Sequence, residues 1–416
     1  MKKWLWGEGH CHSNFSDGFH SIKELTQLYE EYEIDFRFQT DHVFAQMPQG
    51  RYMNPYQELN DGHCLLPETV DEYLSQCKSA CSTKHLVIPG AEFGLQFKPG
   101  PWTLNRYFDH HILIRPLTKS SLPKEKDLKE KWWPDIWNLC SKSTRGQLSM
   151  AHVSDDKSPW QILPELPNLN SLELVNNLES VEPADDRKWL SWWDYMLSMG
   201  KRIVLTTGSD SHQGDLWCAS AMRNVVRIEG TPDAGKLTEA LYAGKSYLSG
   251  TFHPDIWRAL GEKGILPERN GFTPWFSLGE RISRKEASGK VWEWIAKGIE
   301  NNYGRIKKKD FPKMEITVNG AEIGDELSLG PKKRVNVNLA IRMNVPISKI
   351  CIIVSGKVLW SACPLKNSFK TEIDLDLGDD AKYLRVIVSG NGENKDQKET
   401  LISNPVWLRK AKEKVL

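Results

Sequence analysis

The chain has 416 residues, 39% of them hydrophobic and 26% charged, which is enough for more than one packed core. Lysine plus arginine (55) nearly equal aspartate plus glutamate (54), and this balance excludes a global field that would gather nucleic acid or an anionic membrane. We therefore expect two domains and a small-molecule substrate, with neither nucleic acid nor a membrane as partner.

The first part of the chain alternates short apolar runs with helix-like segments. This order predicts an α/β fold, with buried parallel strands covered by helices. The expected strands are 34–38, 85–89, 111–114, 147–151, 172–175 and 203–205, and the expected helices are 21–32, 70–81 and 185–199. The spacing of Trp133 and Trp137, and of Trp189, Trp192 and Trp193, favours buried helix faces over a surface that binds a sugar or an aromatic ligand.

The pattern changes from Met314 onward, where apolar and polar residues alternate with period two between Gly, Asn and Asp turns. The alternation predicts a C-terminal antiparallel β-sandwich-like domain. Between the two parts lies a mixed, basic stretch with one expected helix at 291–299. The expected domains are residues 1–258, a connector at 259–312, and residues 313–412.

The eight cysteines form no paired CxxC motifs and no dense disulfide framework, a pattern typical of a reducing compartment. The start, MKKWLWGEGH, has an apolar run too short for a signal peptide, and no later stretch is long enough to span a bilayer. These features predict a cytoplasmic protein.

Histidines and carboxylates gather where the predicted strands of the first part end, beginning with Gly9-His10-Cys11-His12. Residues two apart on an extended segment project to the same face, so His10 and His12 can reach one ion. Asp17 follows in a Ser-Asp-Gly turn that can bring a carboxylate back over the same site. An isolated His-x-His can equally be two surface histidines, so the assignment depends on the blocks that follow.

Similar blocks stand at the ends of the later strands, where all of them follow a strand except His110-His111, which opens one. They are Asp41-His42, Glu92 after Pro-Gly-Ala, His110-His111, Ala151-His152, and Asp210 with His212 in Gly-Ser-Asp-Ser-His. A core histidine satisfied by one hydrogen bond is the ordinary alternative for each, but it does not explain why so many lie beside carboxylates at strand ends. The series predicts a metal cluster.

These blocks, in this order, resemble the metal-binding motifs of the polymerase and histidinol phosphatase (PHP) family. The resemblance spans roughly residues 5–250. It implies a distorted seven-stranded, TIM-like β/α barrel. The β-rich tail, with its Ser-Asn-Pro-Val-Trp segment at 403–407, is similar to the CehA/McbA-like branch, whose barrels also carry a C-terminal β domain.

The resemblance implies three ion positions at one mouth of the barrel, with one glutamate bridging the first two. Their ligands would be His10, His12, Glu92 and Asp210 for the first, Glu92, His111 and His152 for the second, and Asp17, His42 and His212 for the third. His110 competes with His111, and we choose His111 because it begins the pattern His-Ile-Leu. Asp41 is expected to orient His42 through its other ring nitrogen.

Such a cluster predicts a metal-dependent hydrolase in which a metal-bridged hydroxide attacks a phosphate ester, with Asp210, His212 and Glu92 in catalytic roles. The mixed nitrogen and oxygen ligands suit two or three ions of zinc, manganese or iron, and disfavour magnesium. Carboxylic ester, amide or carbamate hydrolysis by the same cluster is the alternative. A nuclease or a non-enzymatic metal-binding module ranks lower, because no basic stripe accompanies the barrel and the ligand blocks are intact.

A phosphorylated substrate also calls for fixed cations near the ions. The candidates are Arg37, Arg106, Arg115 and Lys157. The ordinary alternative for Arg106, Arg115 and Lys157 is a solvated loop charge, and for Arg37, which interrupts an apolar strand, a buried ion pair.

Overall fold

The computed structural model describes residues 2–16, 18, 20–44, 65, 69–96, 109–121, 137–138, 140–142, 147–151, 153, 166–176, 187–211, 222–252, 307–392 and 398–410. The predictions for Asp17, Arg106, His152, Lys157 and His212, for the side chain of His110 and for the helix at 291–299 lie outside the described residues.

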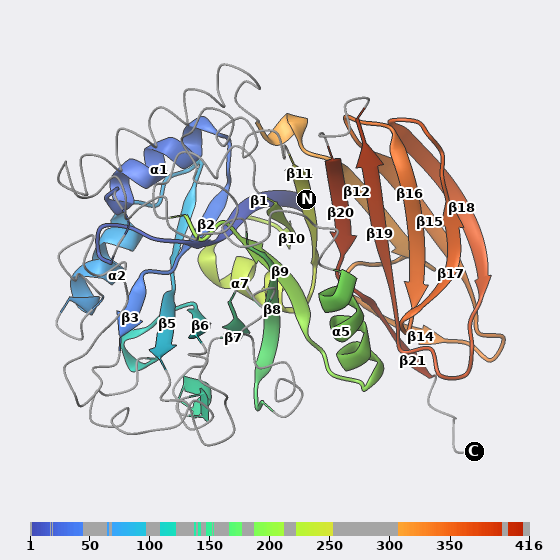
Figure 1. The fold of residues 1–416 in the computed structure, drawn as a ribbon, viewed down its shortest axis with the longest axis horizontal. Helices are drawn as coiled ribbons and strands as arrows, with labels where there is room; N and C mark the ends of the chain where they lie inside the picture. Colours follow the sequence, from blue (N-terminus) through green and yellow to red (C-terminus); the bar gives the residue numbers. More distant parts are fainter. Residues whose placement is uncertain are drawn as a thin grey trace, which may run out of the picture.

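The first region, residues 2–252, alternates strands and helices (Figure 1). Its strands are β1 (Lys2–Cys11), β2 (Phe36–Gln39), β3 (His42–Phe44), β4 (Leu86–Pro89), β5 (Ala91–Gln96), β6 (Asp109–Arg115), β7 (Gln147–Met150), β8 (Leu169–Asn176), β9 (Val204–Gly208), β10 (Arg223–Glu229) and β11 (Ser246–Phe252). Its helices are α1 (Ile22–Glu31), α2 (Val70–Ser79), α5 (Arg187–Ser198) and α7 (Ala234–Tyr242), with a 3-10 turn η2 (Lys119–Ser121).

Helix α1 begins at a capping box formed by Ser21 and Glu24. Ser21 accepts from the backbone N–H of Glu24, whose carboxylate accepts from the backbone N–H of Ser21 in return, so two otherwise unpaired donors are satisfied. Ile22, Leu25 and other apolar positions of the helix are buried. The helix lies against β2, where Arg37 donates to Ile22 O, and its placement follows from this cap and this apolar stripe.

The strands of the first region form two sheets that meet at backbone breaks. Strands β1, β2 and β4 are parallel neighbours in one sheet, and β3, β5, β6, β7, β8 and β9 form the other. Only Thr40 and Asp41 separate β2 from β3, and only Gly90 separates β4 from β5. A parallel bridge between Cys11 and Ser211 joins the end of β1 to the segment after β9.

The expectation of parallel strands is wrong for β6, and two strands that the sequence did not predict, β10 and β11, are antiparallel as well. Strand β6 runs antiparallel to both β5 and β7, while β10 runs antiparallel to β1 and β11. Apolar runs show that a strand is buried, but they do not encode its direction.

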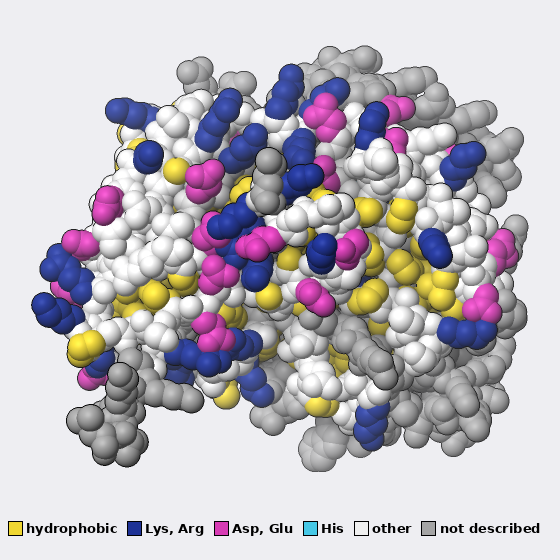
Figure 2. All heavy atoms as spheres, turned by 180° about the vertical axis from the view of Figure 1, so that it is seen from behind, with side chains coloured by type: hydrophobic (Ala, Val, Ile, Leu, Met, Phe, Trp, Pro, Cys, Tyr) yellow, Lys and Arg dark blue, Asp and Glu magenta, His cyan; other side chains and the backbone are white. Residues whose placement is uncertain are grey.

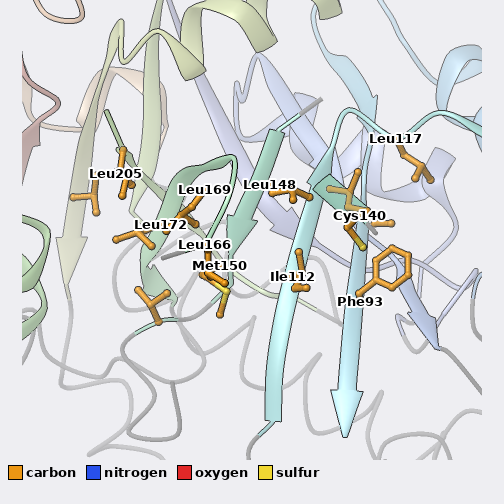
Figure 3. Packing of buried hydrophobic residues seen from close by; sticks show 14 of the residues in the cluster. Phe93, Ile112, Leu117, Cys140, Leu148, Met150, Leu166, Leu169, Leu172 and Leu205 are labelled. Atoms are coloured by element: carbon orange, nitrogen blue, oxygen red, sulfur yellow. The ribbon is translucent and has the colours of Figure 1, made fainter. Parts of the chain in front are cut away.

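Side chains along β5 to β9 alternate between a polar and an apolar face. Phe93, Ile112, Met150 and Leu205 belong to one apolar cluster (Figure 3). The cluster also contains residues of α2 and α5. The residues between them on these strands include Glu92, His111, Ser149, Glu173 and Thr206, which project to the other face. The helices therefore cover the apolar face, and the polar face is left for the functional site.

Two of the clustered tryptophans lie in this core as expected. Trp137 and Trp193 are fully buried, and their indole N–H groups donate to Pro167 O and Ile203 O. They support helices against the sheet and do not line a ligand surface.

The C-terminal region, residues 307–410, consists almost entirely of strands. They are β12 (Lys313–Val318), β13 (Ala321–Glu322), β14 (Glu326–Leu329), β15 (Arg334–Arg342), β16 (Ile347–Val354), β17 (Lys357–Ala362), β18 (Ser368–Asp376), β19 (Tyr383–Asn391), β20 (Lys398–Ser403) and β21 (Val406–Lys410), after the 3-10 turn η4 (Lys308–Asp310). Strands β13, β12, β15 and β18 form one sheet, and most pairs are antiparallel. Along β15 burial alternates strictly, with Val335, Val337, Leu339 and Ile341 in the core.

The two regions share one sheet and one core. Strand β11 pairs antiparallel with β20, so an 11-stranded sheet runs from β4 to the C-terminal strands (Figure 1). Trp6, Val225 and Tyr247 of the first region pack in the same cluster as the C-terminal core. Asp194 of α5 also pairs with the fully buried Arg385 of β19.

The fold is thus mixed α/β with a large proportion of sheet, as the sequence predicts. One face of the molecule intersperses Lys and Arg with Asp and Glu, in keeping with the near-zero net charge (Figure 2). Among the described helices, none combines the length and apolar character needed to cross a bilayer.

Candidate metal centre

Four donor atoms converge beyond the end of β1. His10 Nε2 lies 3.1 Å from His12 Nε2, 3.1 Å from Glu92 Oε2 and 3.2 Å from Asp210 Oδ1. His12 Nε2 lies 3.2 Å from Glu92 Oε2 and 2.8 Å from Asp210 Oδ1. Ligands bound at about 2.0–2.2 Å from one divalent ion lie about 3 Å or slightly more apart, so this donor set fits a single ion.

Glu92 belongs to a second group of donors as well. His42 Nδ1 lies 3.1 Å from Oε2 of Glu92, and His111 Nδ1 lies 2.6 Å from Oε1. The residues His42, Glu92 and His111 form a second potential metal-binding group, which shares its carboxylate with the first. Oε2 faces nitrogen atoms of both groups and Oε1 faces His111, so this carboxylate lies between the two groups and can bridge two ions.

Asp210 reaches the cluster through an unusual backbone conformation. Its φ angle is +51°, in the left-handed region that few residues other than glycine, asparagine and aspartate adopt. Its N–H donates to His10 O at 2.9 Å, while His12 N–H donates to Ser211 O at 2.9 Å. These two bonds tie the chain after β9 to the His-x-His segment.

Burial and charge favour a cation at the centre of the cluster. His10, His12 and Glu92 are fully buried, whereas the side chains of Asp210 and His111 are 11% and 14% exposed. Burial by itself raises the pKa of Glu92, but neighbouring histidines, His10 first, outweigh it and hold that pKa well below its usual range. The low pKa keeps this buried carboxylate ionised, and an ionised carboxylate among nitrogen donors favours a bound cation.

His10 shows the reciprocal effect. Burial by itself lowers its pKa, but the negative charges of the carboxylates, Glu92 first, raise it well above the usual range. Burial likewise raises the pKa of Asp210, yet the charge of His10 outweighs it and the pKa falls well below normal. A bound cation would take the place of the protons that these groups attract.

The segment that carries His12 is held by Asp41. Oδ1 of Asp41 accepts from Ser13 N–H at 2.7 Å and from Ser16 Oγ–H at 2.8 Å, and Oδ2 accepts from Gln39 Nε2 at 2.9 Å. Ser16 Oγ in turn lies 3.4 Å from His12 Nδ1. Asp41 was expected to support His42, but these contacts place its carboxylate under the His12 segment.

Glu8 fastens the same strand end to β9. Its Oε1 accepts from the N–H groups of Gly9, His10 and Ser209, and its Oε2 pairs with Arg223 at 3.0 Å. All of these groups lie in the interior, where a bonded charge pair costs less than an unpaired one. The pair stabilises the junction on which both His10 and Asp210 depend.

The prediction that Arg37 contacts substrate is wrong. Its side chain is fully buried, and it donates to Ile22 O at 2.7 Å, Thr26 Oγ1 at 3.0 Å and Gln39 Oε1 at 2.9 Å. Its guanidinium also lies 5.4 Å from the ring centre of Tyr29. The residue fastens α1 to β2.

The same correction applies to Arg115. It is fully buried, donates to Gly9 O at 2.8 Å, and lies near Ser171 and Thr206 with its guanidinium 5.3 Å from the ring centre of Phe38. It fills the polar interior between strands, because a long side chain on the inner face of β6 has no route to solvent.

One expected ligand lies in a different group of donors from the one that the sequence predicts. His42 was assigned to the third ion, with Asp17 and His212, but it lies against Glu92 and its ring stacks on that of His12, with 4.3 Å between centres. His111, chosen over His110, is in contact with Glu92. The roles of Asp17, His152 and His212 stay predictions.

One residue near the cluster was not given a role from the sequence. This residue is Glu173, which is fully buried on β8. In the structure its carboxylate faces His10 Nδ1, at 2.9 and 3.3 Å from the two oxygens. The sequence feature that could have indicated this role is its position among the polar residues near the ends of buried strands.

No family model and no curated protein matches this sequence. Among solved structures, the chain is similar to a two-domain protein from Bacteroides vulgatus that contains a predicted PHP-like metal-dependent phosphoesterase. That comparison gives 14% identity and a TM-score of 0.43, over 96% of this chain and 95% of that one. It is also similar to an amidohydrolase from Chromobacterium violaceum with bound sulfate and no metal, at 11% identity and a TM-score of 0.32, over 50% of this chain and 87% of that one.

Proposed function

We propose that the protein is a metal-dependent hydrolase of the PHP type that cleaves phosphate esters. The observation that carries the proposal is the position of Glu92, which belongs to both potential metal-binding groups: its Oε2 lies 3.2 Å from His12 Nε2 and 3.1 Å from His42 Nδ1, and its Oε1 lies 2.6 Å from His111 Nδ1. A shared carboxylate between two nitrogen-rich donor sets is what a site for two neighbouring divalent ions requires. The order of the ligand blocks in the sequence supports the choice of a phosphate ester.

The described residues divide the work at such a site. His10, His12 and Asp210 would hold one ion with Glu92, while His42 and His111 would hold the second with the same carboxylate. Divalent ions bound here supply Lewis acidity and lower the pKa of a coordinated water. The buried network around these residues keeps the donors in place, and His152 is the proposed further ligand of the second ion.

Access to the site follows from the exposure of the donors. Among the ligands that the structure describes, Asp210 and His111 are the most exposed by side chain, at 11% and 14%, while His10 and His12 are fully buried. A substrate therefore approaches over Asp210 and His111. Asp210 is on this side of the cluster, and the catalytic roles of the buried Glu92 and of His212 are proposed from the sequence.

We also propose that the first region is the distorted seven-stranded barrel that the resemblance implies. Counting β2 with β3 and β4 with β5 as interrupted strands, the order β1, β2/β3, β4/β5, β6, β7, β8 and β9 returns to β1 at the Cys11–Ser211 bridge. The polar inner face and helix-covered outer face support this arrangement. The C-terminal region would be its sandwich-like companion, as in the CehA/McbA-like branch.

Metal analysis and a substrate screen test this function. The purified protein is expected to retain close to two equivalents or more of zinc, manganese or iron, and to hydrolyse phosphomonoesters or phosphodiesters. His12→Ala and Asp210→Ala should each lose metal and activity. Asp233→Asn, an exposed helix cap far from the cluster in which asparagine caps equally well, is the matched control.

The outcomes separate the alternatives. Turnover that survives both His12→Ala and Asp210→Ala overturns the metal-dependent mechanism. Turnover of carboxylic esters or amides, with no phosphate ester cleaved, keeps the metal centre and overturns the phosphoesterase assignment in favour of the carbonyl hydrolase.

A further inference from the structure

The two histidines of the His-x-His segment receive different support. His12 Nδ1 faces a hydroxyl, Ser16 Oγ at 3.4 Å, and that hydroxyl in turn donates to Asp41. His10 Nδ1 instead faces a carboxylate directly, with Glu173 Oε2 at 2.9 Å and Oε1 at 3.3 Å. The support of His10 is therefore shorter, and it comes from an anion.

We propose that Glu173 is the positioning residue of the metal centre, and that it fixes both the ring orientation and the tautomer of His10. An ionised carboxylate has no proton to give, so a hydrogen bond in this pair requires the proton to be on Nδ1 of His10. The lone pair of the neutral ring is then on Nε2, the atom that faces His12, Glu92 and Asp210. This inference rests on the proposed function, because it assigns Nε2 to a bound ion.

The surroundings of Glu173 leave it little freedom. Its side chain is fully buried on β8, and its carboxylate lies beside Gly208 on the neighbouring strand β9. A Cβ atom at position 208 would come within 2.4 Å of Glu173 Oε1 and 2.3 Å of His10 Cβ. Glycine at 208 thus gives the carboxylate and the ring the space they need to meet.

A carboxylate behind a ligating histidine also increases the basicity of that histidine and strengthens its bond to the ion. Removing such outer partners weakens metal affinity by about 10-fold to 100-fold in known metal sites. Glu173→Gln keeps the shape of the side chain and one hydrogen-bond acceptor but removes the charge, so we expect it to weaken metal affinity by about 10-fold. Glu173→Ala removes the whole group, and we expect it to weaken metal affinity by about 100-fold.

The matched control is Glu399→Gln. Glu399 is also fully buried, and its carboxylate accepts from Asn344, but it belongs to β20 in the C-terminal region. The same isosteric change there should leave the affinity for zinc or manganese within about 2-fold of the wild type, since no ligand depends on it. Affinity is measured by competition with a chromophoric chelator.

A second measurement reports on the His10 ring without any ion. Proton NMR of the metal-free protein should show a downfield, slowly exchanging Nδ1–H signal from His10, because that proton is buried and donates to a carboxylate. The signal should move in Glu173→Gln and disappear in Glu173→Ala, while it persists in Glu399→Gln. This readout keeps the proposal testable if the alanine variant folds poorly.

The proposal is overturned if the wild type lacks this signal, or if Glu173→Gln and Glu173→Ala bind the ion as tightly as Glu399→Gln does. If the wild type shows the signal and the predicted loss of affinity but hydrolyses no ester, the positioning role is supported and the proposed function fails. The two failures are thus distinguishable.

Discussion

The two regions of the molecule bury different kinds of side chain. The interior of the first region contains ionisable and polar groups, including Glu8, His10, Arg37, Glu92, Arg115, Glu173 and Arg223. The core of the C-terminal region is mainly aliphatic, with Ile316, Val337, Ile352 and Val388 among its members, although it also buries the charged side chains of Arg385 and Glu399. In the first region, a dense network of hydrogen bonds compensates for the loss of hydration of these buried polar groups.

This contrast shows where the molecule is built for function and where for stability. Aliphatic packing gives stability without any chemical capability. Buried charges are tolerated only where well-placed hydrogen-bonding or ionic partners compensate for the cost of removing them from water. Changes to the first region should therefore alter metal content and pH response, and changes to the C-terminal core should alter the free energy of unfolding alone.

The largest expected effect is that of Glu92→Ala. Removing the shared carboxylate should abolish binding of both ions and reduce turnover by about 1,000-fold or more, since the ions supply several kcal/mol of transition-state stabilisation. Metal analysis and steady-state kinetics measure this effect. Retention of one tightly bound ion and of full activity would show that Glu92 does not bridge.

The contact between the two regions is tested by Asp194→Ala. Asp194 accepts from Arg385 Nε at 2.7 Å and from Tyr383 Oη at 2.6 Å, and Arg385 is 1% exposed by side chain. An unpaired buried guanidinium should destabilise the fold by about 3 kcal/mol, as measured by urea unfolding.

The control for this pair is Asp374→Ala, which removes the partner of Arg334 on the exposed face of the C-terminal sheet. Solvent screens that pair, so little change in unfolding is expected. Equal losses for Asp194→Ala and Asp374→Ala would contradict the structural role of the buried pair.

A pH effect is expected from His85, which lies in the polar interior of the first region. Burial, followed by the charge of Arg37, lowers the pKa of His85 to about 3. Below the ordinary pKa of about 6.5, His85 of the unfolded chain binds a proton, whereas His85 of the folded chain stays neutral down to about pH 3. The free energy of unfolding is therefore highest above pH 6.5 and decreases as the pH falls toward 3.

Between pH 7 and pH 5.5 this one group should cost about 1 kcal/mol of stability. Urea unfolding of the wild type and of His85→Gln at both values measures the difference. The pH dependence of the variant should be shallower, whereas an unchanged slope would mean that His85 is protonated in the folded state.

The smallest expected effect comes from the aliphatic core. Ile352→Val removes one buried methylene from β16, where Ile352 is fully buried, and should cost about 1 kcal/mol. Val358→Ala, on the neighbouring strand β17 at 56% exposure, should cost clearly less. Metal content should stay at the wild-type level in both, and a loss of bound ion in Ile352→Val would argue against the division between the regions.

Much of the first region could be predicted from local patterns. The expected strand at 111–114 lies within β6, and the expected helix at 21–32 corresponds to α1 with its cap at Ser21. Period and capping are local properties, so they can be recognised in a single sequence. Strand direction depends on partners far along the chain, and the direction of β6 was accordingly wrong.

The same limit applies to the site. The ligands His10, His12 and Glu92 could be proposed because each stands in a motif at a strand end. The role of Glu173 depends on a contact with a residue 163 positions away, which no local pattern encodes. The substrate-binding roles predicted for Arg37 and Arg115 were wrong for the same reason. The alternation along a strand shows that a side chain points inward, but it does not show whether the end of that side chain reaches a pocket or a backbone carbonyl group.

The pairing of β11 with β20 limits how this protein can be divided for study or engineering. A chain cut after β11 would leave the backbone N–H and C=O groups of that strand unpaired along a newly exposed edge, beside the uncovered side chains of Trp6 and Tyr247. Open edges with apolar neighbours recruit other chains and promote aggregation. Expression trials should therefore keep both regions together, and chimaeras should exchange surface loops in preference to whole regions.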